Sequence, residues 1–158
     1  SIICAVRQKQ INWAVNLIRD NSRLDIVHAD GRMYINETQR RFDAAVKDAF
    51  SCRSVPAHLV TLETYKRLQE IVDGPVYVNL IDEPDGQLAR GTHAILTQLY
   101  PHVSAVMGPI SDRGYANIIL TASPTPNVVM DPIPAGFAVT TLGASRAFTD
   151  NRGWIGHR

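Results

Sequence analysis

The clearest indication of the fold of this chain is the stretch at residues 61–81, TLETYKRLQEIVDGPVYVNLI. Thr61 is a good helix N-cap, Glu63 follows in the first turn, and apolar side chains recur at helical spacing until Gly74-Pro75 ends the helix. Residues 76–81 form a nearly continuous apolar run, which is typical of a strand covered on both faces. A helix followed at once by such a strand predicts an α/β domain.

The same alternation extends outward from this stretch in both directions. We expect strands at 1–5, 24–28, 42–47, 76–81, 103–107 and 115–122, and helices at 6–19, 32–39, 61–73 and 88–100. The last two strands have no helix between them and should therefore pair antiparallel. The order predicts a mostly parallel sheet with an antiparallel final strand and helices on both faces, and residues 137–142 could add a peripheral strand.

Composition narrows the class of protein. The chain has 158 residues, 45% of them apolar, and a net charge of +1, which indicates one ordinary globular domain rather than a disordered chain or a basic nucleic-acid binder. No apolar run approaches the ~20 residues of a membrane helix. Cys4 and Cys52 form neither a disulfide framework nor a zinc cluster, so a cytoplasmic location is expected. We divide the chain into an α/β domain at 1–123 and a Pro-rich connector and C-terminal tail at 124–158.

Acidic residues follow three of the predicted strands, at the edge where open parallel sheets bind ligands. Asp30 could accept a hydrogen bond from an adenine amino group, with Gly31 allowing close approach of the ring, or it could cap the helix that begins at Arg32. Asp48 could orient or deprotonate a substrate amine, or it could serve as a turn residue. Residues 82–83 are expected to form a solvated acidic turn.

Other candidates are weaker. Cys52 lacks a nearby histidine that would activate its thiol, and His28 and His58 have no metal-ligand spacing. No glycine-rich phosphate loop is present, which argues against nucleoside triphosphate chemistry. We therefore expect no metal site.

Several segments resemble spermidine synthase-like proteins. They are LDIVHADGR at 24–32, RFD at 41–43, KDAFS at 47–51, VPAHLVT at 55–61 and the late strand GYANIIL at 114–120. These proteins are relatives of aminopropyltransferases within the class I S-adenosylmethionine-dependent methyltransferase fold. The resemblance covers roughly residues 1–123 and implies a Rossmann-like, methyltransferase-type sheet.

The resemblance also implies roles for individual residues. Asp30 and Gly31 match the pair that contacts the adenine of S-adenosylmethionine or its decarboxylated form, and Asp48 matches the catalytic, amine-orienting carboxylate. Ser51 stands where true aminopropyltransferases carry a second aspartate that helps to hold the polyamine, so we assign it to substrate binding and leave polyamine specificity open. The family reaction needs no metal.

The N-terminal part departs from the family pattern. The glycine-rich cofactor loop and the carboxylate that holds the ribose have no counterpart, and residues 1–4 match the second strand of the family. Three explanations for the missing first strand stay open. The chain is a fragment of a longer protein, residues 137–142 fill the gap, or another chain supplies the strand. The implied function is transfer of an aminopropyl or methyl group to an amine acceptor by a cytoplasmic homodimer. The alternative is a non-catalytic binding or assembly module that has lost its cofactor, so enzymatic activity is left open.

Overall fold

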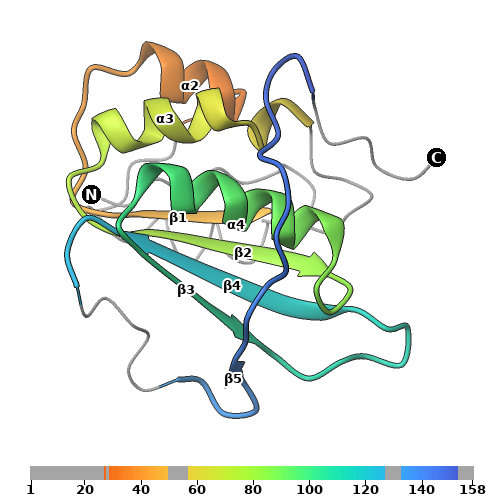
Figure 1. Cartoon of the computed structure of the whole chain (residues 1–158). Helices are drawn as coiled ribbons and strands as arrows, with labels where there is room; N and C mark the ends of the chain where they lie inside the picture. The colour runs from red at the N-terminus through yellow and green to blue at the C-terminus, as the bar shows by residue number, and fades with distance from the viewer. Residues whose placement is uncertain (1–26, 28, 50–56, 127–132, 153–158) are drawn as a thin grey trace.

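The computed structural model describes residues 27, 29–49, 57–126 and 133–152. They form one sheet with helices packed on it, and Figure 1 shows all three described helices on the same side of the sheet. In chain order the elements are α2 (Gly31–Glu37), β1 (Ala45–Ala49), the 3₁₀ turn η1 (Ala57–Leu59), α3 (Leu62–Ile71), β2 (Val76–Asp82), α4 (Gln87–Leu99), β3 (His102–Met107), β4 (Ala116–Ser123) and β5 (Ala138–Val139).

The sheet has the strand order β1-β2-β4-β3-β5. β1 and β2 pair in parallel, whereas β4 lies between β2 and β3 and is antiparallel to both. Helix α4 carries the chain from β2 over to β3 and leaves room for one strand between them, which β4 then fills. The predicted α/β class and the antiparallel pairing of the last two long strands are confirmed. The strands and helix predicted at 1–5, 6–19 and 24–28 fall mostly outside the described residues.

Local sequence signals place the central elements. The hydroxyl of Thr61 caps α3 by accepting from the Thr64 amide, as predicted, and Glu63 lies in the first turn. The helix ends at Ile71, earlier than the Gly74-Pro75 signal, because the next residue is already extended. In β2 one face is fully buried beneath α3 and α4, and the side chains of the other face are half-buried.

Strand β1 begins later than the sequence predicts. The apolar segment at 42–47 suggests a strand from Phe42, but Phe42 makes only an isolated bridge to Val72, and the ladder with β2 runs from Ala45 to Ala49. Phe42 is nevertheless buried in the core. Its apolar character reflects packing under α3 rather than membership of the strand.

The C-terminal strap, residues 140–152, crosses the helical side of the sheet (Figure 1). Its carbonyl at Phe148 accepts a hydrogen bond from the Leu62 amide at the start of α3, and the Phe148 ring is buried in the core. A side chain at Gly91 of α4 would overlap that ring, so glycine at this position lets Phe148 of the strap pack against the helix. Part of the predicted tail therefore packs directly on the α/β core.

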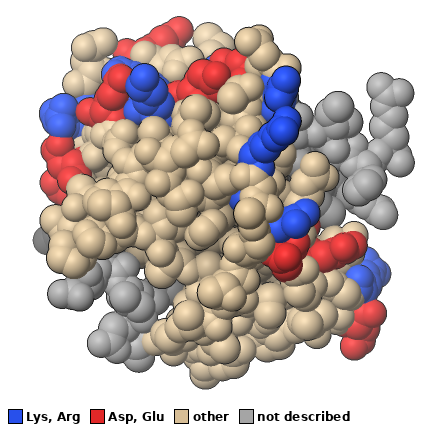
Figure 2. Space-filling view, viewed as in Figure 1, with Lys and Arg blue, Asp and Glu red and all other residues tan. Residues whose placement is uncertain are grey.

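The surface carries both signs of charge. On the face shown in Figure 2, acidic and basic side chains lie side by side, and a wide area between the charged groups is uncharged. None of the described helices has both the length and the apolar character that crossing a bilayer requires.

Candidate functional site

Asp30 is the N-cap of α2. Its Oδ1 accepts hydrogen bonds from the amides of Arg32 and Met33, at 3.0 and 3.1 Å. Its Oδ2 lies 3.4 Å from Nε2 of His58. These contacts, the Met33 amide above all, lower the pKa of Asp30 and keep it ionised at neutral pH. The capping role that the sequence left open is thus observed, and the side chain remains 45% exposed.

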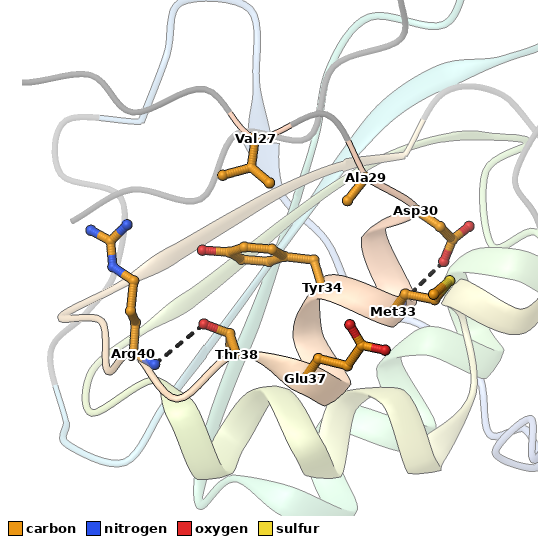
Figure 3. Close-up of a pocket in the computed structure, with 8 residues that line it drawn as sticks. All are labelled: Val27, Ala29, Asp30, Met33, Tyr34, Glu37, Thr38 and Arg40. Carbon is orange, nitrogen blue, oxygen red and sulfur yellow. Dashed lines mark hydrogen bonds between the residues drawn. The ribbon is translucent and has the colours of Figure 1, made fainter.

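A cavity of about 550 Å³ opens beside this carboxylate. In Figure 3 the Tyr34 ring occupies its middle, with Asp30 towards one end and Arg40 towards the other. The lining residues come from α2 and the segments on either side of it: Val27, Ala29, Asp30, Met33, Tyr34, Glu37, Thr38 and Arg40. An aromatic wall next to an ionised acceptor suits a planar base that carries an exocyclic amino group.

Gly31 is half-buried at the first position of α2. A Cβ atom there would meet only the Leu59 side chain, at 3.7 Å, which is an ordinary contact. The fold therefore does not itself require glycine at this position. Close approach of a ligand to the Gly31 backbone stays a prediction.

Asp48 lies in β1, one residue before its end, and is exposed. It pairs in register with Asn79 of β2, whose Nδ2 donates to Asp48 Oδ1 at 2.8 Å. Because side chains alternate along a strand, Asp48 points to the face opposite Lys47, which contacts α3. Asp48 is not among the residues that line the cavity beside Asp30. The structure therefore does not bring the two predicted carboxylates into one cavity, and Ser51, Cys52 and His28 lie outside the described residues.

Asn79 is a site residue that the sequence reading did not identify. The Asn79 amide must present its nitrogen to Asp48, since a carbonyl oxygen would repel the carboxylate. Its Oδ1 is buried and has no hydrogen-bond partner among the described residues. A single asparagine inside the apolar run at 76–81 was the available signal, because a buried strand rarely carries an amide without a polar partner.

Lys47, next to Asp48, is the other unanticipated group. Its ammonium donates to the Leu59 carbonyl and to the Tyr65 hydroxyl, the latter at 3.1 Å, and lies 4.3 Å from the centre of the Tyr65 ring. Burial beneath α3 lowers the pKa of Lys47 to about 7. Its only signal in the sequence is that the predicted strand at 42–47, apolar apart from Asp43, ends in a second charged residue.

The prediction of a solvated turn at residues 82–83 is wrong for Asp82, which lies at the end of β2. The residue is only 6% exposed, and its carboxylate accepts from the amides of Glu83 and Ala89, both at 2.9 Å. It supplies the cap that Gly86, the N-cap residue of α4, cannot provide. Burial raises the pKa of Asp82. Glu83 remains exposed, as expected of a turn.

Metal binding finds no support in the described part of the chain. There, no group of three or more His, Cys, Asp or Glu side chains is placed to hold an ion.

No protein-family model matches the sequence, and no curated protein matches it significantly. Solved structures do match its fold. A probable spermidine synthase from Corynebacterium glutamicum has a TM-score of 0.60 at 24% identity, over 70% of this chain and 44% of that one. The chain has a spermidine synthase-like fold.

Two further structures agree with this assignment. A spermidine synthase in complex with the transition-state analogue AdoDATO has a TM-score of 0.56 at 16% identity, over 84% of this chain and 48% of that one. The spermidine synthase from Thermotoga maritima has a TM-score of 0.53 at 17% identity, over 87% of this chain and 48% of that one. The spermidine synthase-like, Rossmann-type fold expected from the sequence is confirmed, and the chain spans less than half the length of each of these proteins.

Proposed function

We propose that this chain carries the donor and acceptor carboxylates of a spermidine synthase-like transferase. The observation that carries the proposal is the hydrogen bond between Asn79, in the middle of β2, and Asp48, which lies one residue before the end of the parallel strand β1, at the carboxyl edge of the sheet. In open α/β sheets this edge is where ligands bind. The spermidine synthase-like fold supports the reaction class, transfer from an S-adenosylmethionine-type donor to an amine.

The donor would bind through its adenosine. An adenine amino group would donate to Oδ2 of Asp30, because Oδ1 is already occupied by the two amides of the helix cap. The cavity beside Asp30 has room for a nucleoside, and the Tyr34 ring offers it an apolar wall. Gly31 would let the base approach the backbone closely.

The acceptor amine would bind at Asp48. Asn79 holds Oδ1, so Oδ2 remains to accept a proton from the attacking amine. Because Asp48 does not line the cavity beside Asp30, the propyl group of the bound donor would have to extend out of that cavity to reach the amine; the amine lone pair would then form a bond to the propyl carbon attached to the donor sulfonium as the carbon–sulfur bond breaks. With decarboxylated S-adenosylmethionine, the leaving group is 5′-methylthioadenosine; with S-adenosylmethionine, attack on the methyl carbon instead transfers a methyl group and releases S-adenosylhomocysteine. Positioning supplies most of the rate enhancement, and no metal is assigned a role.

The finer assignments belong to the same proposal. Ser51 would contact the acceptor in place of an aspartate, which leaves the identity of the amine to experiment. A cytoplasmic homodimer is the form in which we expect the transferase to act. We assign it neither a nucleic-acid nor a membrane partner.

Calorimetric titration with 5′-methylthioadenosine tests the donor site. Asp30→Ser is the informative variant, since serine keeps the helix cap while removing the carboxylate. We expect saturable binding by the wild type and weaker binding by Asp30→Ser. Asp112→Ser is the control, because it removes an exposed carboxylate from the loop between β3 and β4 and should leave the affinity unchanged.

The acceptor site is tested by aminopropyl transfer from decarboxylated S-adenosylmethionine to a panel of diamines. Asp48→Asn should abolish turnover and leave nucleoside affinity nearly intact. Equal turnover in that variant contradicts the role of Asp48. Absence of nucleoside binding at millimolar concentration favours the second candidate, a non-catalytic module.

A further inference from the structure

The end of the C-terminal strap docks beside the carboxylate that we propose for adenine recognition. Arg32, in the first turn of α2, makes a two-pronged contact with Asp150 of the strap, at 2.8 Å to Oδ1 and 2.5 Å to Oδ2. The same guanidinium donates to the His58 carbonyl at 3.1 Å. The Asp150 amide in turn donates to Glu63 of α3 at 3.0 Å. The strap therefore joins the starts of α2 and α3.

Arg32 has a competing partner close by. It follows Asp30 by two residues, and the charges of Glu63 and then Asp30 add to the electrostatic stabilisation of its guanidinium, although the hydrogen bond to Asp150 contributes most to raising the pKa of Arg32. A guanidinium released from Asp150 would find in Asp30 an ionised carboxylate that is 45% exposed. An Arg–Asp pair formed there would occupy the oxygen that an adenine amino group needs.

We propose that Asp150 is a positioning residue of the nucleoside site, which holds the Arg32 guanidinium on the strap and so keeps it away from Oδ2 of Asp30, the oxygen that His58 contacts at 3.4 Å and that we assign to the ligand. This inference rests on the proposed function of Asp30. Asp150 does not touch the ligand; it acts through Arg32.

The fold fixes Asp150 where this role requires it. Two residues earlier, Phe148 is buried in the core, and its carbonyl accepts from the Leu62 amide at 2.8 Å. Farther back along the strap, the Gly143 amide donates to Asp85 at 2.6 Å. Because the buried Phe148 anchors the strap two residues before Asp150, and the Asp150 amide is itself held by Glu63, the carboxylate of Asp150 is held in place before Arg32 meets it, and little conformational entropy is lost in forming the pair.

The test measures the affinity for 5′-methylthioadenosine by calorimetry in the wild type, Asp150→Asn, Arg32→Gln and the double variant. We expect Asp150→Asn to bind about fivefold more weakly, the largest effect that a partly exposed ion pair of this kind supports. Adding Arg32→Gln should restore the affinity, because the competing guanidinium is then gone. Asp150→Glu, which keeps a carboxylate, should bind close to wild type.

Asp85→Gly is the matched control. It removes the acceptor of the Gly143 amide and loosens the strap away from Arg32, and glycine tolerates the left-handed backbone at this position, where φ is 55°. We expect no change in nucleoside affinity. An equal loss of affinity in Asp85→Gly and Asp150→Asn would mean that strap anchoring in general matters, and would overturn the specific role of Asp150.

The remaining outcomes separate this inference from the proposed function. Wild-type affinity in Asp150→Asn overturns the inference and leaves the nucleoside site standing, and so does a double variant that stays as weak as Asp150→Asn. If Asp150→Asn does not fold, the Arg32→Gln variant tests the inference by itself. It should bind 5′-methylthioadenosine at least as tightly as the wild type, and weaker binding overturns the inference. If the wild type does not bind 5′-methylthioadenosine, both the inference about Asp150 and the proposed nucleoside site are overturned.

Discussion

Replacing Lys47 with methionine should change how the stability of the fold depends on pH. The ammonium of Lys47 lies between β1, η1 and α3, where it meets the Leu59 carbonyl and the Tyr65 hydroxyl and, among the residues that the structure describes, no carboxylate. Burial lowers its pKa from 10.5 to about 7. Between these two values the unfolded chain carries a proton on Lys47 that the folded chain has lost. Raising the pH through this window therefore favours the folded state.

The expected magnitude follows from that difference in pKa. Each unit corresponds to about 1.4 kcal/mol, so the full shift would be worth about 5 kcal/mol. The side chain keeps some exposure, which reduces the effect, and we expect the free energy of unfolding to rise by about 2 to 3 kcal/mol between pH 7 and pH 9.5. Below pH 7 the lysine is protonated in both states and the dependence ends. Lys47→Met should remove this rise and leave whatever pH dependence the other groups contribute.

Urea unfolding followed by circular dichroism, in half-unit steps from pH 7 to 9.5, measures how the free energy of unfolding of the wild type and of Lys47→Met changes with pH. The upper limit avoids the region where tyrosines of the unfolded chain titrate. Lys66→Met removes an exposed lysine from α3 and controls for the loss of one positive charge. Parallel curves for the wild type and Lys47→Met would refute the argument, because they would show that the folded state does not disfavour the charged amine. A change in the denaturant dependence alone would not count as support.

Three further substitutions test the packing and the site. Gly91→Ala should destabilise the fold by about 1 to 3 kcal/mol, since the new methyl would overlap the Phe148 ring; urea unfolding at the stability of the wild type would contradict this. Thr61→Ala should cost about 1 kcal/mol through loss of the α3 cap, seen as a lower Tm, and an unchanged Tm would argue against the cap. Asn79→Ala should lower transfer about tenfold with little change in nucleoside affinity, because Asp48 would lose the group that orients it; unaltered turnover would exclude that role.

What the sequence predicts well is local. The Thr61 cap, the helix that follows it and the strand from Val76 depend on residues a few positions apart, so short patterns identify them. The place of β4 between β2 and β3 depends on pairing across the sheet, which no short pattern encodes. The burial of Asp82 likewise depends on α4 folding back over the end of β2. An amide of α4 then reaches the Asp82 carboxylate, which the sequence pattern alone places in an exposed turn.

The sequence proposes residue types for the candidate site but does not give their arrangement. Asp30 and Asp48 both follow predicted strands, which suggested a shared cleft, but strand alternation sends Asp48 to the face of β1 opposite α3. The partners that define each carboxylate come from distant segments: Asn79 for Asp48, and His58 for Asp30. Contacts of this range follow from the fold, and only the odd polar residue in an apolar run hints at them.

η1 links the two carboxylates through the backbone, and Lys47 is part of that link. Lys47 immediately precedes Asp48 and donates to the carbonyl of Leu59, the last residue of η1. The neighbouring residue of η1, His58, contacts Asp30 through its ring and accepts from Arg32 through its carbonyl. A chain of contacts therefore runs from β1 through η1 to the start of α2. The buried lysine lowers stability, but its contact with the Leu59 carbonyl is part of the connection between the strand that bears the proposed acceptor carboxylate and the helix that bears the proposed donor carboxylate.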